Sequence, residues 1–299
     1  MISARSYPLV CFALAASLAV GCKSGGAVED DAGAETGAST GAADTSAEAG
    51  ANETTADSGE EGKTTPESAA GAPNEIAAAD EPIKVTPFGH GSLMLSYKGK
   101  NIYIDPVANE LPEGDLARAD LVLVTHIHGD HLDPASIARV RKDGAPVVSP
   151  ASVAEKAGAE LPEPTIMANG DSEKFLDGAV EVEAVAMYNL VRKRDNGEFF
   201  HPKGRGNGYV LTLGGKRIYI SGDTECTPEM KALENIDAAF VCMNLPYTMT
   251  VEEAGGCLAE FKPKVAYPYH HRDQDPGKLE GMLQGKDVEV TILEWYPEK

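Results

Sequence analysis

Four side chains of types that can bind metal ions lie within six residues, directly after a short apolar segment. Residues 121–124 are apolar and partly β-branched, which predicts a buried strand. The chain then continues Thr125-His126-Ile127-His128-Gly129-Asp130-His131. In an extended segment residues i and i+2 share one face, so His126 and His128 can bind one ion while Ile127 packs into the core. Gly129 allows a turn that directs Asp130 and His131 towards a second ion. The fold must therefore place the end of a buried strand at a metal site.

The ligand types indicate which ions such a site binds. Imidazole together with carboxylate suits Zn²⁺, and also Mn²⁺ or Fe²⁺, whereas an all-oxygen Ca²⁺ or Mg²⁺ site would not use so many histidines. The alternative is a solvated loop after a strand, in which three histidines and an aspartate would be neighbours by chance. We therefore expect a metal centre at this strand end.

Composition divides the 299 residues into three stretches. Residues 1–22 carry one charged residue and an apolar run at 8–20, which is too short to span about 30 Å of hydrocarbon and is typical of a secretory signal. Residues 23–82 hold 14 acidic residues against two lysines and no aromatic residue, which predicts a disordered linker. Residues 83–299 contain all seven histidines and have the length of one domain.

The signal ends Leu18-Ala19-Val20-Gly21-Cys22, which resembles a bacterial lipobox. This resemblance implies a lipidated Cys22 and a protein anchored in the bacterial cell envelope, on its periplasmic or outer-membrane face. The alternative is ordinary cleavage near Gly21 with an incidental Cys22. In both cases the domain works outside the cytoplasm, and an anchored linker gives it a reach of about 40–45 Å.

Charge narrows the class of partners. The chain has 26 Lys and Arg against 47 Asp and Glu, a net charge of −21, which excludes a protein that coats nucleic acid. Around His201 the balance is reversed, since residues 192–205 hold five basic against two acidic residues. A cationic loop of this kind attracts an anionic small-molecule substrate, such as a phosphoester or a carboxylated lactone. The alternative is a solvated, charged hairpin. The basic residues are Arg192, Lys193, Arg194, Lys203 and Arg205.

Three cysteines follow Cys22, and their spacing fits no metal motif. In an oxidising compartment Cys226, Cys242 and Cys257 allow one disulfide at most. The favoured interpretation is that Cys242 and Cys257 are small buried apolar residues and that Cys226, close after Asp223, lines the site.

Strand and helix patterns alternate along residues 83–299. Turn residues at Lys98-Gly99-Lys100 and Gly214-Gly215 predict tight antiparallel hairpins. Sheets with amphipathic helices on their outer faces are therefore expected, an α/β class. The predicted strands are 83–88, 93–97, 101–104, 121–124, 180–186, 209–213, 217–220, 238–241, 265–267 and 288–293, and the predicted helices are 134–142, 152–157, 228–233, 251–261 and 276–283.

The sequence His126-x-His128-x-Asp130-His131 resembles the hallmark of the metallo-β-lactamase superfamily, and the resemblance covers residues 83–299. It implies a four-layer αββα sandwich with metal ions at one edge of the sheets. Ser221-Gly222-Asp223-Thr224 resembles the turn that carries a metal-bridging aspartate, and His270 resembles the late histidine after a strand. Residues 88–92 and 102–106 look like the subgroup of ascorbate phosphate lactonases and N-acyl-phosphatidylethanolamine phospholipase D.

The resemblance also implies roles. Two divalent ions, Zn²⁺ before Mn²⁺ or Fe²⁺, would activate a water molecule for attack on an ester, lactone or phosphoester. Asp130 would orient this water and take its proton. By resemblance the first ion is bound by His126, His128 and His201, the second by Asp130, His131 and His270, and Asp223 bridges them.

One position departs from the family pattern. Where many relatives carry a third histidine for the first ion, this chain has Asn189, and a neutral amide oxygen binds zinc weakly. His201 can replace it, Asn189 with water can fill the position, or the site is weakened to a single metal. Two other functions therefore remain open: a non-catalytic, metal-binding surface lipoprotein, and an oxidoreductase that uses one iron.

Three further residues need separate interpretation. Asp105, at a strand end, is expected to accept the free N–H of a ligating histidine, with a turn cap before Pro106 as the alternative. His90 lies at a glycine-rich turn, where a place in the substrate pocket and a plain surface turn are equal alternatives. His271 points away from its neighbour His270 along an extended chain and is expected to be a solvated histidine.

Overall fold

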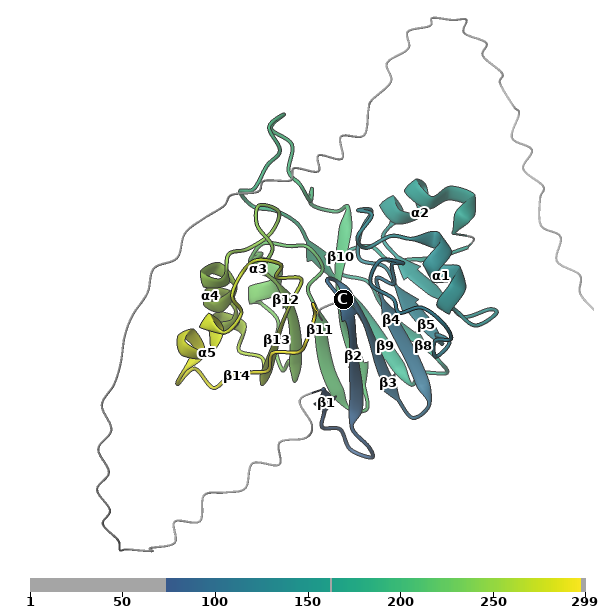
Figure 1. Cartoon of the computed structure of the whole chain (residues 1–299), viewed down its shortest axis with the longest axis horizontal. Coiled ribbons are helices and arrows are strands. Elements are labelled where there is room, and N and C mark those ends of the chain that lie inside the picture. Colours follow the sequence, from purple (N-terminus) through teal and green to yellow (C-terminus); the bar gives the residue numbers. More distant parts are fainter. Residues whose placement is uncertain (1–73, 162, 297–299) are drawn as a thin grey trace, which may run out of the picture. The chain divides into compact units, whose positions relative to one another are not determined.

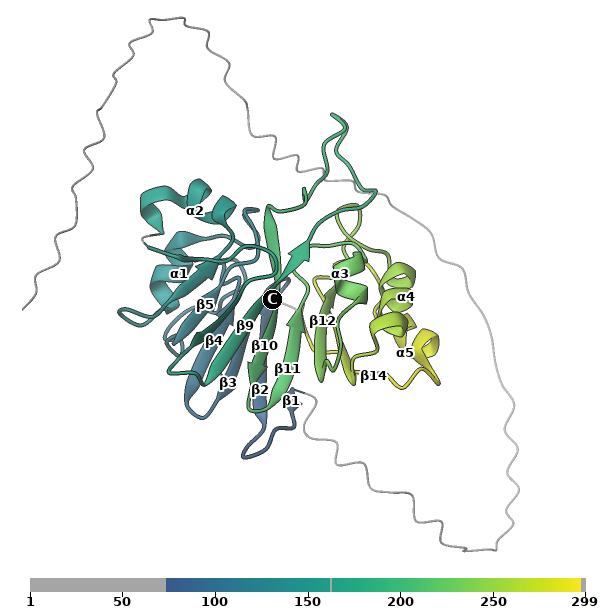
Figure 2. The same cartoon turned by 180° about the vertical axis from the view of Figure 1, so that it is seen from behind.

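Two seven-stranded sheets pack face to face in the computed structural model, which describes residues 74–161 and 163–296. The first sheet has the order β1-β2-β3-β4-β5-β6-β7, and the second has the order β14-β13-β12-β11-β10-β9-β8. Figures 1 and 2 show α1 and α2 outside one sheet and α3, α4 and α5 outside the other. The four-layer αββα sandwich expected from the sequence is confirmed.

The elements have the following bounds. The strands are β1 Glu75–Ile76, β2 Ile83–Gly89, β3 Ser92–Tyr97, β4 Lys100–Ile104, β5 Leu121–Leu123, β6 Val147–Ser149, β7 Thr165–Ile166, β8 Ser172–Phe175, β9 Val180–Met187, β10 Gly206–Leu213, β11 Lys216–Ile220, β12 Ala238–Cys242, β13 Val265–Tyr269 and β14 Glu289–Val290. The helices are α1 Pro134–Val140, α2 Ala151–Ala157, α3 Pro228–Lys231, α4 Val251–Phe261 and α5 Lys278–Leu283, with one 3₁₀ turn at Gly158–Glu160.

Both halves of the domain follow one plan. In each sheet four strands pair antiparallel, β1 to β4 and β8 to β11, and the strands that follow continue parallel. The predicted hairpins at Lys98-Gly99 and Gly214-Gly215 join β3 to β4 and β10 to β11. Positive φ at all four of these residues supplies the twist that tight antiparallel turns need. The parallel crossovers that follow β5, β6, β11, β12 and β13 carry α1 to α5, which form the outer layers.

The larger apolar core lies between the sheets. It combines fully buried residues of both sheets, such as Leu95 and Ile104 from the first and Tyr209 and Phe240 from the second. A smaller core, with Val122, Ile137 and Val153, joins the first sheet to α1 and α2. Both faces of the parallel strands are therefore covered, which explains why β5 reads as a continuous apolar run.

Four strands were not predicted from the sequence. Two of them, β6 and β7, are only three and two residues long, and β8 exposes three of its four residues and so lacks an alternating pattern. The strand β1 lies inside the stretch expected to be a linker up to residue 82, and it pairs with β2. The ordered chain thus begins before residue 83, because Ile76 is apolar enough to join the core.

The remaining predictions for the N-terminus, including the signal at 1–22, Cys22 and the linker up to residue 73, lie outside the described residues. None of the helices in 74–161 and 163–296 has the length and apolar character to cross a bilayer.

A disulfide joins Cys226 to Cys257. The interpretation of Cys257 as a free apolar residue was therefore wrong, and Cys226 is bonded to α4 instead of lining the site. Cys242 is buried as expected and free, and burial raises the pKa of its thiol to about 12. The bond fixes the segment just after Asp223 to a helix of the outer layer.

Replacing Cys226 and Cys257 together by alanine is expected to lower the free energy of unfolding by about 3 to 4 kcal/mol, since the bond closes a loop of 31 residues. Urea unfolding of wild type and variant measures the difference. Wild type treated with dithiothreitol should match the variant, and dithiothreitol should not affect the variant itself. Equal unfolding midpoints for oxidised wild type and variant would contradict this account.

Candidate metal centre

The predicted site residues meet at one edge of the sandwich. The parallel strands β4 and β5 lead into Asp105 and His126, and β11 and β13 lead into Asp223 and His270. Two successive antiparallel pairings make β2 run in the same direction as β4, and β9 in the same direction as β11. His90, which follows β2, therefore lies at this edge as well. The crevice outside the carboxyl ends of strands is the usual ligand site of such sheets.

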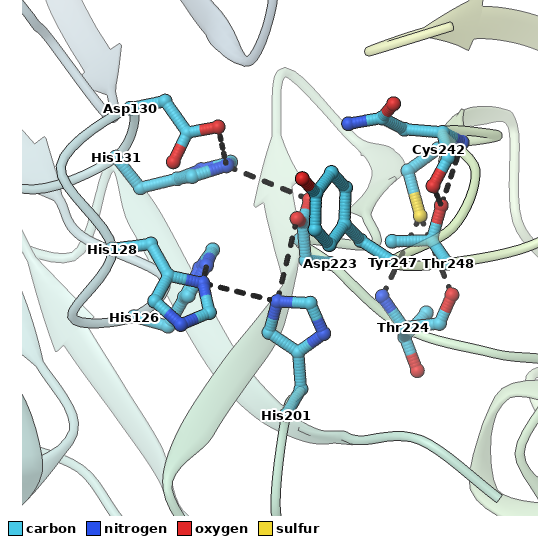
Figure 3. Close-up of polar contacts among 12 residues, drawn as sticks. His126, His128, Asp130, His131, His201, Asp223, Thr224, Cys242, Tyr247 and Thr248 are labelled. Carbon is cyan, nitrogen blue, oxygen red and sulfur yellow. Dashed lines mark hydrogen bonds and ion pairs between the residues drawn. The ribbon is translucent and has the colours of Figure 1, made fainter. Parts of the chain in front are cut away.

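Three histidines form a first group. The His128 Nδ1 atom lies 3.0 Å from His126 Nε2 and 3.2 Å from His201 Nε2. The second carboxylate oxygen of Asp223, Oδ2, lies 3.4 Å from His201 Nε2. Figure 3 shows His126 and His128 on one side of this group and His201 on the other. Three nitrogens and one oxygen thus converge, which is a ligand set that zinc accepts.

A second group lies beside the first. The Nε2 atoms of His131 and His270 are 3.0 Å apart, and both are close to the other oxygen of Asp223, Oδ1, at 3.5 and 3.4 Å. The Oδ2 atom of Asp130 lies 3.6 Å from His270 Nε2. Both rings are fully buried.

Asp223 stands between the two groups, with one carboxylate oxygen towards each (Figure 3). Its Oδ1 atom is buried and has no hydrogen-bond partner among the described residues. A buried carboxylate oxygen without a donor is costly unless a cation satisfies it. These residues therefore fit a pair of divalent ions that share Asp223.

Burial favours the neutral form of the three imidazoles in the first group. Burial lowers the pKa of His126, His128 and His201. The pKa of His201 falls to about 4, although the nearby Asp223 carboxylate favours its charged form. A metal ion needs a neutral imidazole with a free lone pair, so these three rings require no loss of a proton before they bind.

Three carboxylates surround His131 in the second group. Burial disfavours its charged form, but Asp223 and Asp105 outweigh burial and raise the pKa of His131 to about 10. Asp105 Oδ2 accepts from His131 Nδ1 at 2.7 Å, and Thr125 donates both its N–H and its hydroxyl to the Asp105 carboxylate. Asp105 thus orients His131 so that Nε2 faces the centre, the arrangement expected of a partner of a ligating histidine.

His201, and not Asn189, lies in the first group. The Asn189 Oδ1 atom contacts both the backbone N–H and Nδ1 of His201, at 2.6 and 3.0 Å, so this oxygen faces away from the ion position. The Nδ2 atom of Asn189 donates to Glu225 and to the Tyr247 carbonyl. The asparagine therefore fixes the tautomer and orientation of His201.

Replacing Asn189 by alanine is expected to weaken binding of the first ion about 10- to 100-fold, since the change removes the group that orients His201. Zinc titration against a competing chelator measures this affinity. Asn169→Ala is the matched control, because Asn169 bonds to Gly206 and Asn207 and not to His201. Equal zinc affinity in Asn189→Ala and wild type would refute the role.

Glu225 was not predicted from the sequence. Its carboxylate accepts the backbone N–H groups of Leu190, Val191 and Arg192 at 2.7 to 2.9 Å, and these bonds hold its pKa below the usual value despite burial. It thereby shapes the loop after β9 and holds Asn189. Three of its partners are backbone N–H groups, which leave no pattern in the sequence.

His90 lies in the site and not at a surface turn. Its ring is tilted by 34° against that of His270, with 3.7 Å between the ring centroids, and its Nε2 lies 3.1 Å from Asp130 Oδ2. Burial opposes the charged form of Asp130, but contacts with His270 and His90 hold the pKa of this carboxyl well below its usual value. The Tyr296 hydroxyl contacts His90 Nδ1, a contact that the sequence analysis missed.

His271 lies outside both groups. It is half-buried and packs edge-on against Tyr296, so it is less solvated than expected.

Three residues of the site, His90, Asp105 and His270, have φ near +50°, a conformation that costs a non-glycine residue energy. Such strain concentrated at one sheet edge is typical of functional sites.

The basic loop does not form a uniform cationic rim. The Arg192 guanidinium pairs with Glu225 and Glu253, and Lys203 and Arg205 pair with Glu229 and Glu155. Two carboxylates therefore neutralise the charge of Arg192. Arg194 lies nearer the centre, with its Nη2 atom 3.3 Å from His128 Nε2.

Comparison with known proteins identifies the family of the chain. The family described as β-lactamase superfamily domain matches residues 84–270. A UPF0173 metal-dependent hydrolase of Thermococcus kodakarensis is 28% identical over 225 residues, which are 71% of this chain and 96% of the relative. A crystal structure from Parabacteroides distasonis, of a candidate metal-dependent hydrolase, is 40% identical with a TM-score of 0.67 and covers 72% of this chain and 94% of that one. The metallo hydrolase Igni18 of Ignicoccus hospitalis shares the fold, with a TM-score of 0.59 and 24% identity. The match covers 71% of this chain and 95% of that one.

Proposed function

Because the chain belongs to the β-lactamase superfamily domain family and is a metal-dependent hydrolase, we propose that it binds two divalent ions, Zn²⁺ first, and cleaves ester, lactone or phosphoester bonds of a small molecule. In this proposal His126, His128 and His201 bind one ion. Asp130, His131 and His270 bind the other. Asp223 binds both.

One observation carries the proposal. The two oxygens of the buried Asp223 carboxylate face two different groups of imidazoles, and one of these oxygens has no hydrogen-bond donor among the residues described. A site for a single ion would not need a carboxylate whose two oxygens face two different groups of imidazoles. The separation of its oxygens suits ions a few ångströms apart, as in two-metal hydrolases.

The ions, when bound, supply a reactive hydroxide near neutral pH and polarise the bond that is cleaved. The protein's own groups do the remaining work. Asp130, whose side chain is 38% exposed, is the carboxylate of the site that faces solvent, and it orients the nucleophile and takes its proton. His90 holds Asp130, and Asp105 holds His131, so both groups keep their orientation through the reaction.

The proposal includes export and anchoring. Residues 1–22 would act as a signal, Cys22 would carry the lipid, and residues after it would act as a linker to the cell envelope. The Cys226–Cys257 bond supports an extracytoplasmic site, because disulfides persist mainly in oxidising compartments.

Metal removal tests the proposed function. Protein stripped with a chelator is expected to lose hydrolysis of a panel of 4-nitrophenyl esters, lactones and phosphodiesters, and to regain it at about two zinc or manganese ions per chain. One iron per chain with oxygen consumption would favour the single-iron oxidoreductase. Full loading without turnover of the whole panel would favour a non-catalytic metal-binding protein.

A further inference from the structure

A pocket opens beside the first histidine group. It has a volume of about 220 Å³ and is lined by residues 126–128 after β5 and by the connection between β9 and β10, which carries Arg194, Phe200 and His201. Its walls include Ile127, Met187 and Phe200. Figures 1 and 2 show the β9–β10 connection projecting beyond both sheets. A substrate bound at the metal centre can therefore extend along an apolar wall.

Arg194 stands at this pocket with its charge unpaired. Its guanidinium carbon lies 5.2 Å from the Phe200 ring centroid, and Phe200 packs edge-on against Tyr247. Within residues 74–161 and 163–296, no carboxylate forms an ion pair with Arg194, whereas Arg192, Lys203 and Arg205 each have such a partner. Aromatic packing thus holds the guanidinium in place without neutralising it.

The contact between Arg194 and His128 lacks a hydrogen-bond acceptor. His128 Nδ1 faces His126 and His201, so this nitrogen is the one that meets the metal ion under the proposed function. The proton of the neutral ring then lies on Nε2, which is 3.3 Å from Arg194 Nη2. Two donors therefore face the same space, and a shared acceptor would satisfy both.

We propose that Arg194 and His128 Nε2 bind a non-reacting anionic group of the substrate, a carboxylate or a phosphate, while the apolar part of the substrate packs against Phe200. The site thus selects esters that carry a negative charge a few bonds from the cleaved bond. This inference rests on the proposed function and names the substrate class of that site. Planar donors of this kind match the two oxygens of a carboxylate or phosphate.

Nearby charges are compatible with an anion. Glu198 is the one carboxylate among the pocket residues, and its Oε2 accepts from Asn196 at 3.1 Å. Arg205 also lines the pocket, with its partner Glu155 at the longer distance of 3.7 Å. Arg194 is thus the lining arginine without a carboxylate partner among the described residues, inside a protein with net charge −21.

Paired substrates test the proposal. Mono(4-nitrophenyl) glutarate and 4-nitrophenyl pentanoate share a leaving group and a five-carbon acyl chain, but only the glutarate carries a carboxylate. R194Q is expected to raise KM for the glutarate about 10- to 100-fold and to leave KM for the pentanoate within about twofold. K193Q is the matched control, since Lys193 carries the same charge on the same loop without lining the pocket, and it should alter neither KM. Equal effects of R194Q on both substrates, or none, would overturn the proposal while the hydrolase function stands.

A binding measurement keeps the test independent of turnover. Calorimetric titration of the zinc-loaded protein with 4-phenylbutyrate, 4-phenylbutyramide and 3-phenylpropylphosphonate compares two anions with a neutral analogue. Wild type should bind at least one anion about tenfold more tightly than R194Q does, and the amide equally in both. The anion with the larger loss identifies carboxylate or phosphate as the natural group. Unchanged affinity for both anions in R194Q would refute the subsite, whereas absence of turnover with retained anion binding would count against the hydrolase function alone.

Discussion

Asp223→Asn is expected to lower kcat/KM by about a thousandfold or more and to reduce the metal content from two ions to one or none. The carboxylate is buried, and each of its oxygens faces one histidine group. An amide removes the negative charge and offers one acceptor atom instead of two, so one ion loses its ligand. Loss of one preorganised electrostatic group alone costs about 10² to 10³ in rate, and here the ion is lost as well.

The measurement combines kinetics with metal analysis on the same preparation. Circular dichroism should be unchanged, since the variant replaces a buried charge by a group of the same shape. Asp143→Asn is the control, because Asp143 is exposed in the turn after α1 and belongs to neither histidine group. Asp223→Asn with two ions and full activity would contradict the bridging role.

Asp130→Ala is expected to lower kcat by roughly 10² to 10⁴, the range for loss of a general acid or base. The carboxylate is the partly exposed acidic group of the centre, held by His90 at 3.1 Å and near His270 at 3.6 Å. Because it acts on the nucleophile and not on the substrate, KM should change much less than kcat. Kinetics at saturating zinc separate this effect from weaker metal binding.

His128→Ala extends the same test to the first histidine group. The His128 ring lies between His126 and His201, so its loss should abolish hydrolysis with the fold retained. His271→Ala is the matched control, since His271 adjoins His270 in sequence but lies outside both groups. Full activity of either Asp130→Ala or His128→Ala in metal-replete protein would refute the catalytic account.

The sequence predicted those elements whose pattern is local. The hairpins around Lys98-Gly99 and Gly214-Gly215 follow from turn chemistry, and α4 follows from its apolar spacing. In the structure Thr250 and Glu253 also form a capping box at the start of α4. Short parallel strands such as β6 have no local signal, because pairing with β5 and β7 creates them. Tertiary context decides such segments.

The site shows the same division. Residues 126–131 predict a metal centre through their spacing, and the structure brings their side chains together with those of His201, Asp223 and His270. The sequence left His201 and Asn189 as alternatives, since only the fold shows that Asn189 contacts His201. Charge counting also grouped Arg192 with Arg194. In the structure Arg192 pairs with Glu225, whereas Arg194 contacts His128.

The disulfide could not be deduced from spacing. Three cysteines permit several pairings, and the bond depends on α4 packing beside the segment that follows Asp223. The same segment carries Asp223 and Glu225, so the bond stabilises the turn that presents both carboxylates to the site.

Anomalous diffraction at the zinc edge, from crystals of the zinc-loaded protein, tests the central claim most directly. We predict two peaks about 3.5 to 4 Å apart, one beside His126, His128 and His201 and the other beside Asp130, His131 and His270, with Asp223 between them. Absence of a peak within coordinating distance of Asp223, or zinc bound only elsewhere on the protein, would contradict the account.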